Sequence, residues 1–118
     1  MLNQLVIVGR MVKDPEMVEG EDGKKRLNMT LAVQRPYKNA EGIYEADFIP
    51  VTMWDTVAEK TTEYCKKGDI IGVKGRVQTS NYEIDGEKKF RMDVVAERVT
   101  FLESRSHGHQ EQEQDMER

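Results

Sequence analysis

The feature that most constrains the fold is a repeat of hydrophobic residues at every second position in several short segments. In residues 26–35 these are Leu27, Met29, Leu31 and Val33, and in residues 69–79 one face carries Ile71, Val73 and Val77 together with Gly75. A period of two is typical of β-strands with one buried face. Polar residues such as Lys74 and Arg76 occupy the alternate positions. The chain is therefore expected to be a small protein built mainly from strands.

The pattern predicts five strands, at residues 4–8, 26–35, 46–54, 69–79 and 88–101. Residues 13–23, 36–42 and 81–86 have the composition of turns and loops, and Asp85-Gly86 is a hairpin signal. Residues 55–68 change to helical spacing, with Asp55 as the expected N-cap and Lys66-Lys67-Gly68 at the end. The stripe of this helix is expected to be Val57, Ala58, Thr61, Tyr64 and Cys65.

This order of elements predicts an all-β fold with small α content. It is the order of the OB-fold, a five-stranded Greek-key barrel, with one helix between strands 3 and 4. Gly9, Gly72 and Gly75 lie inside strands, where glycine often marks a bend at a barrel corner. We expect residues 1–103 to form this domain and residues 104–118 to be a disordered polar tail, because Met116 is its only large apolar residue.

The composition excludes several classes of protein. The 118 residues suit one domain, and no apolar run approaches the roughly 18 residues of a membrane helix. The first residues do not resemble a signal peptide, and Cys65 is the only cysteine, so a cytoplasmic protein is expected. No nucleophile–base pair or metal-ligand cluster is evident, which predicts no enzyme activity, no metal and no cofactor. The net charge of −4 leaves the partner open.

The segment at residues 46–54 is unusual because both of its faces carry apolar residues. One face holds Ile49, Val51 and Met53, and the other holds Phe48, Pro50, Thr52 and Trp54. OB barrels commonly bind oligonucleotides or oligosaccharides on strands 2–3 and in adjacent loops. Tyr37 beside Lys38, and Tyr82 near Lys88, Lys89 and Arg91, would join Phe48 and Trp54 on that side. Exposed rings between cations suit sequence-tolerant binding of single strands.

The chain resembles the bacterial single-stranded DNA-binding protein (SSB) family over residues 1 to about 103. The resemblance depends on an ordered set of motifs at the family's spacing. They are Asn3 to Arg10 followed by Asp14-Pro15-Glu16, Thr30-Leu31-Ala32-Val33, Phe48-x-x-Val51-x-Met53-Trp54, Ala58-Glu59, Tyr64, Lys67-Gly68 and Val73-x-Gly75-Arg76-Val77. Any one of these motifs is weak evidence, but the ordered set is specific.

The resemblance implies a homotetramer with single-stranded DNA wrapped across its subunits. Such a protein would bind DNA without sequence specificity and protect it during replication, recombination and repair, in the cytoplasm at the nucleoid. The family's base-stacking aromatics fall on Tyr37, Phe48, Trp54 and Tyr82. Its phosphate contacts would fall on some of Arg10, Arg35, Lys38, Lys74, Arg76, Lys89 and Arg91.

Two segments depart from the family pattern. Residues 78–81 read Gln-Thr-Ser-Asn where the best-studied members are strongly basic. The tail is short and ends Asp115-Met116-Glu117-Arg118, whereas the family's usual end is an acidic cluster capped by Pro-Phe that docks replication and repair proteins. The chain therefore resembles a short-tailed member, in which such proteins remain candidate partners but docking through the tail is not expected.

Two other hypotheses remain open at this point. One is a replication-restart accessory protein of the primosome, which is also a small OB-fold module on single strands. The other is an oligomeric interaction scaffold, in which the face with Phe48 and Trp54 is a contact between subunits.

Overall fold

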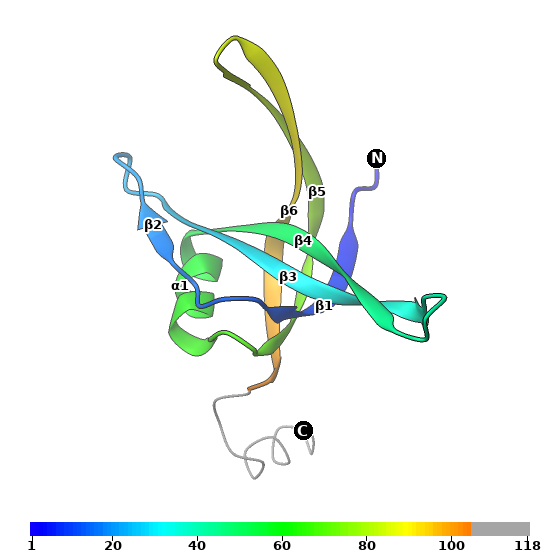
Figure 1. The fold of residues 1–118 in the computed structure, drawn as a ribbon. Helices are drawn as coiled ribbons and strands as arrows, with labels where there is room; N and C mark the ends of the chain where they lie inside the picture. The colour runs from blue at the N-terminus through cyan, green and yellow to red at the C-terminus, as the bar shows by residue number, and fades with distance from the viewer. Residues whose placement is uncertain (105–118) are drawn as a thin grey trace.

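The computed structural model describes residues 1–104, and the predicted tail, from residue 105 onward, lies outside the described residues. Six strands and one helix follow one another along the chain (Figure 1). They are β1 (Leu5–Met11), β2 (Met17–Glu19), β3 (Lys25–Lys38), β4 (Tyr44–Trp54), α1 (Asp55–Tyr64), β5 (Ile70–Ile84) and β6 (Glu87–Glu103). No helix within residues 1–104 is long and apolar enough to cross a membrane.

The five long strands close into a barrel. The sheet order is β1-β5-β6-β4-β3-β2, and a further pairing of β1 with β3 joins its two ends. This closing contact is short, with Arg10 opposite Ala32 and Met11 opposite Leu31. The β4–β6 pairing is parallel, and the other pairings are antiparallel. The predicted fold class is confirmed, with the helix between the third and fourth long strands, β4 and β5.

The core is built from the predicted alternate positions. Its completely buried side chains come from β3, β4, β5 and α1 and include Leu27, Leu31, Val51, Met53, Ala58, Ile71 and Val73. Met11 and Cys65 add to the same cluster where β1 and α1 end. Burial raises the pKa of the Cys65 thiol to about 12, so this group stays protonated at neutral pH. The cysteine is therefore a packing residue.

The helix covers one end of the barrel, and its N-terminus differs from the prediction. Trp54 occupies the N-cap position and makes no side-chain capping bond. Asp55 is the first helical residue, and its Oδ1 accepts a hydrogen bond from the backbone N–H of Lys25 at 3.0 Å. Because the carboxylate bonds to β3 rather than to the helix, Asp55 ties α1 to the sheet. Ala58 and Thr61 are the buried helical residues of the predicted stripe, while Tyr64 is exposed.

Three predicted turn or loop segments are partly wrong. Met17–Glu19, inside the expected turn at 13–23, forms β2 and pairs with residues 25–27 of β3. Residues 81–84, assigned to a turn, continue β5, and only Asp85 and Gly86 reverse the chain, both with positive φ. Pro36 to Lys38 likewise extend β3. In each case residues form a strand by pairing with a neighbouring strand, although their own sequence lacks the hydrophobic alternation that predicts one. The β5–β6 hairpin therefore extends far beyond the barrel as an arm (Figure 1).

Gly75 lies at an irregularity where the register between β5 and β6 shifts. A Cβ atom at this position would overlap the backbone carbonyl of Val95, which cannot move like a flexible side chain. By contrast, a Cβ at Gly72 in the same strand would lie 3.6 Å from the nearest atom, Cδ1 of Leu102. The close approach of two backbones therefore requires glycine at residue 75 but not at residue 72.

We predict that Gly75→Ala lowers the free energy of unfolding by about 1–3 kcal/mol, because the methyl group must push β5 and β6 apart. Gly72→Ala is the matched control and should be neutral or slightly stabilising. Urea unfolding followed by circular dichroism measures both variants. Equal stability of the two variants would contradict the assignment of Gly75 to a close backbone contact.

Candidate nucleic-acid interface

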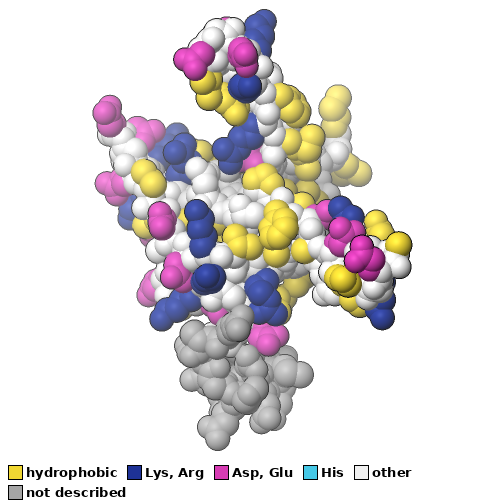
Figure 2. Space-filling model, viewed as in Figure 1, with side chains coloured by type: hydrophobic (Ala, Val, Ile, Leu, Met, Phe, Trp, Pro, Cys, Tyr) yellow, Lys and Arg dark blue, Asp and Glu magenta, His cyan; other side chains and the backbone are white. Residues whose placement is uncertain are grey.

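The outward face of β4 carries the exposed aromatic residues. Phe48 is 66% exposed and Trp54 is 41% exposed, whereas Val51 and Met53 on the opposite face have no exposed surface. Alternation along the strand separates the two sets, since successive side chains point to opposite sides of a sheet. In Figure 2, hydrophobic side chains lie across the middle of the visible face, with Lys and Arg side chains around them. Both rings are thus available to a planar ligand.

Thr52 lies on this outward face but is buried by polar neighbours. Its hydroxyl oxygen is 2.5 Å from Oδ2 of Asp93 on β6 and 3.2 Å from Oδ1 of Asn28 on β3. A hydroxyl has one proton, so Thr52 donates it to the nearer oxygen, that of Asp93. The same Asp93 oxygen lies 3.6 Å from Nη2 of Arg91. These contacts connect β4 to the base of the β5–β6 arm.

The arm continues the face that begins at Asp93. Moving outward, the register pairs Gln78 with Asp93, Ser80 with Arg91, and Tyr82 with Lys89. Because these pairs are two residues apart on each strand, their side chains share one side of the arm. Tyr82 is 46% exposed and lies outside the core, and the register places it opposite Lys89 and diagonal to Arg91. The structure therefore brings Tyr82, Lys89 and Arg91 together on the side that leads back to Thr52.

The β3–β4 hairpin holds Tyr37 and Lys38 at the other end of β4. Tyr37 is 62% exposed, and Nζ of Lys38 lies 5.5 Å from the centre of the Tyr44 ring. The side chain of Asn39 orders the loop, since its Oδ1 accepts hydrogen bonds from the backbone N–H groups of Glu41 and Ile43. A register shift separates this end of the hairpin from the regular β3–β4 ladder.

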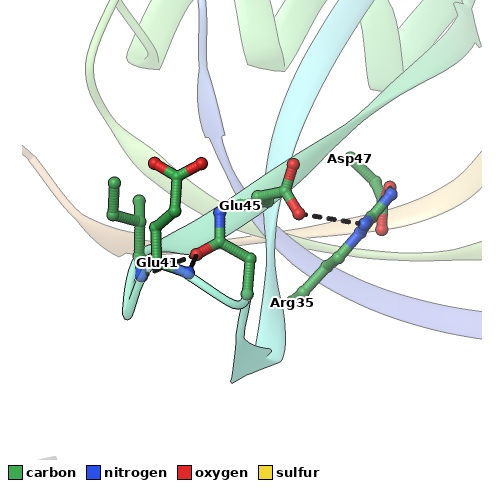
Figure 3. A network of polar contacts seen from close by, with 6 residues as sticks. Arg35, Glu41, Glu45 and Asp47 are labelled. Carbon is green, nitrogen blue, oxygen red and sulfur yellow. Dashed lines mark hydrogen bonds and ion pairs between the residues drawn. The ribbon is translucent and has the colours of Figure 1, made fainter.

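Arg35 is the most strongly paired of the expected phosphate contacts. It lies between two carboxylates, with Nη2 2.8 Å from Oδ1 of Asp47 and Nη1 3.5 Å from Oε1 of Glu45 (Figure 3). The hydrogen bond from Arg35 lowers the pKa of the Asp47 carboxyl, so this pair stays charged at neutral pH. Arg35 also shares the alternation of Leu31 and Val33, which lie on the core side of β3 rather than on the side of Phe48.

The other six expected phosphate contacts fall into two groups. Those in ion pairs with carboxylates are Arg76 with Glu97, Lys89 with Glu87, and Arg91 with Asp93. Among residues 1–104, Arg10, Lys38 and Lys74 make no ion pair. Arg10 instead donates a hydrogen bond from Nη1 to the carbonyl of Gly68 at 2.6 Å, which fixes its side chain beside β1.

Sequence reasoning missed two residues on this face. Tyr44 is 48% exposed and shares the alternation of Phe48 and Trp54 along β4. The strand was predicted to begin at residue 46, and an earlier start would have included this ring. Arg26 lies opposite Trp54 in the β3–β4 ladder. Only the register between the two strands reveals that neighbour.

Comparison with known proteins agrees with this geometry. The single-strand binding protein family matches residues 2–102 of the chain. "Single-stranded DNA-binding protein 3" of Listeria innocua serovar 6a is 48% identical, over 92% of this chain and 68% of the relative. "Single-stranded DNA-binding protein 1" of Clostridium acetobutylicum is 44% identical, over 88% of this chain and 96% of the relative. "Single-stranded DNA-binding protein B" of Bacillus subtilis is 42% identical over 87% and 92%. A barrel of this topology, matched over nearly all of its described length, belongs to the single-strand binding protein family.

Proposed function

We propose that this protein binds single-stranded DNA without sequence specificity and protects it during replication, recombination and repair. The observation that carries the proposal is the pair of exposed rings, Phe48 and Trp54, on a strand whose other face forms the core of a single-strand binding barrel. Tyr37 and Tyr82 would supply further stacking surfaces. Proteins of this family act by binding rather than by catalysis, and the place of action would be the nucleoid in the cytoplasm.

Stacking must supply much of the affinity because the protein carries a net charge of −4. An aromatic ring that stacks on a base contributes about 1–3 kcal/mol and does not depend on base identity. Arg10, Lys38 and Lys74 would contact phosphates directly. Arg35, Arg76, Lys89 and Arg91 would first exchange a carboxylate for a phosphate, which costs little because exposed ion pairs contribute about 0–1 kcal/mol.

We also propose that the protein assembles as a homotetramer, with β1 in a contact between copies. Val6 is 70% exposed and Val8 is 50% exposed on the outward face of β1. Residues 5–9 pair with β5 on one side, while the pairing of β1 with β3 begins only at Arg10. An apolar strand with an open edge favours association with another chain. Four copies are what the family resemblance implies, and replication and repair proteins remain candidate further partners.

We predict that Trp54 emission falls when unstructured poly(dT) is added, because a base stacks on the indole ring. Emission should saturate at a fixed nucleotide ratio and stay constant with a matched duplex, whose bases are already stacked. Phe48→Ala and Trp54→Ala should each weaken binding by about 1–3 kcal/mol. Fluorescence titration measures Trp54 emission in the unmodified protein and in Phe48→Ala. Anisotropy of a labelled oligonucleotide measures the affinity of Phe48→Ala and of Trp54→Ala.

Phe101→Ala is the matched control for the stacking prediction. Phe101 is 45% exposed, but its ring packs 5.8 Å from that of Tyr64 on α1, away from Phe48. Its loss should leave the affinity for poly(dT) unchanged. The scaffold hypothesis predicts the reverse for the site: Phe48→Ala would break the assembly, and poly(dT) would leave Trp54 emission unchanged.

We predict that Val6→Lys combined with Val8→Lys lowers the mass of the assembly in solution, because two charges would be buried in a contact between copies. Val18→Lys is the control, since Val18 on β2 is similarly exposed at 55%. Sedimentation of both variants at micromolar concentration measures the mass. An unchanged mass for the double variant would place the subunit contact elsewhere on the molecule.

A further inference from the structure

Each outward aromatic residue of β4 has a cationic residue in the same transverse row of the sheet. Strand register defines the rows, because residues opposite each other in a ladder point to the same side. The rows pair Trp54 with Arg26, Phe48 with Arg10 across Ala32, and Tyr44 with Lys38. The aromatic residues come from one strand, while the cations come from β1 and β3. A ring beside a cation is the arrangement that binds a base and its phosphate together.

We propose that one single strand runs along β4 across all three rows, so that Tyr44 is an additional base-stacking residue and Arg26 an additional phosphate contact. This inference rests on the proposed function and names the path of the DNA on one subunit. The path would run from the β3–β4 hairpin past Phe48 to Trp54, where the chain enters α1.

Arg26 is suited to its role because its charge is uncompensated. It is exposed, and within residues 1–104 it takes part in no ion pair. The adjacent Lys25 differs, since its Nζ lies 2.7 Å from Oε1 of Glu59 on α1. Successive residues of β3 point to opposite sides, so the two neighbouring cations serve different surfaces. Lys25 holds the helix, and Arg26 lies beside Trp54.

Tyr44 is suited to its role because a groove of about 370 Å³ opens beside it. Tyr44 forms one wall, Arg10 contributes a cation, and Gln34 contributes a side-chain amide that can donate and accept hydrogen bonds. The remaining lining is small or apolar and consists of Val8, Gly9, Ala32, Ala46 and Ile70, with Val8 at the border to the proposed contact between copies. An aromatic wall with a polar amide and a nearby cation fits a nucleotide, and the small residues leave room for it.

The length and the ends of the path are consistent with one strand per subunit. From Tyr44 to Trp54 the backbone rises ten residues, or about 33 Å at ~3.3 Å per residue. At ~3.4 Å per nucleotide, the spacing of stacked DNA, this length holds at most about ten nucleotides. OB-folds occupy roughly 4–16 nucleotides each. Beyond Arg26, Glu19 at the end of β2 and Glu21 and Asp22 in the β2–β3 turn repel phosphate and end the path.

The test compares Arg26→Gln and Tyr44→Leu with two matched controls, Lys25→Gln and Tyr64→Leu. Tyr64 is also an exposed tyrosine, at 59% against 48% for Tyr44, but it lies on α1 and packs against Phe101. Binding of labelled dT oligomers to the full chain is measured at several salt concentrations. Arg26→Gln should make the log–log salt slope shallower by about 0.7, the value for one phosphate on a single strand. Tyr44→Leu should raise the Kd by about 5- to 150-fold, as for the loss of one stacked base.

Neither control should change the Kd or the salt slope. A second measurement uses the unmodified protein, so it does not depend on how the variants fold. A dT strand that carries 5-iododeoxyuridine is crosslinked by light, and peptide fragmentation should locate adducts at Tyr44 as well as at Phe48 or Trp54.

The outcomes separate this inference from the proposed function. If the unmodified protein does not bind dT oligomers, or if Phe48→Ala binds normally, the proposed function fails. If the unmodified protein binds dT oligomers and Phe48→Ala weakens that binding, the proposed function stands. If in that case Arg26→Gln keeps the original salt slope and Tyr44→Leu has the same Kd as Tyr64→Leu, the path along β4 is wrong. A loss of assembly mass in Tyr44→Leu with unchanged affinity would identify Tyr44 as a contact between copies, which also overturns the path.

Discussion

Most strands of this small closed barrel bury one face in the core and leave much of the other face exposed, and the rest of this structure depends on that constraint. In β4 the inward face supplies Val51 and Met53 to the core, while Phe48 and Trp54 on the outward face stay exposed. The same holds for β1, where Val6 and Val8 point away from the core. Apolar side chains grouped on an outward face mark a site for a partner outside the chain. We assign a nucleic acid to one of these faces and a second copy to the other.

The electrostatics of the molecule fit a site in which rings carry much of the binding energy. The chain has 18 Lys and Arg against 22 Asp and Glu, so no general attraction for DNA is expected. Several cations near the site are already paired with carboxylates, as Arg35 is with Asp47. Arg10 and Arg26, which make no ion pair within the part of the chain that the structure describes, lie in the rows of Phe48 and Trp54. These two cations lie where a stacked base would bring its phosphate.

The polar junction around Thr52 explains how a strand and a distant hairpin present one surface. Thr52 donates to Asp93, and Asp93 also lies near Arg91 on the arm. Because Thr52 is buried and the Asp93 side chain is only 13% exposed, their contact fixes the base of the arm relative to β4 without using the hydrophobic core. Tyr82 lies further along the same side of the arm. The arm therefore extends the outward face of the barrel rather than forming a separate surface.

Much of this protein follows from its sequence, because alternation and turn chemistry are local properties. The strand periodicity, the helix after Trp54 and the Asp85-Gly86 reversal each depend on a few neighbouring residues. The same alternation placed Phe48 and Trp54 opposite Val51 and Met53. Register is not local, and only the tertiary structure decided it. Pairing with β3 makes Met17–Glu19 a strand, and pairing of β5 with β6 places Tyr82 on the arm. The β3–β4 pairing brings Arg35 near Asp47 and places Arg26 opposite Trp54. Hydrogen bonds between segments distant in the chain fix these neighbours, and the pattern within one segment does not encode them.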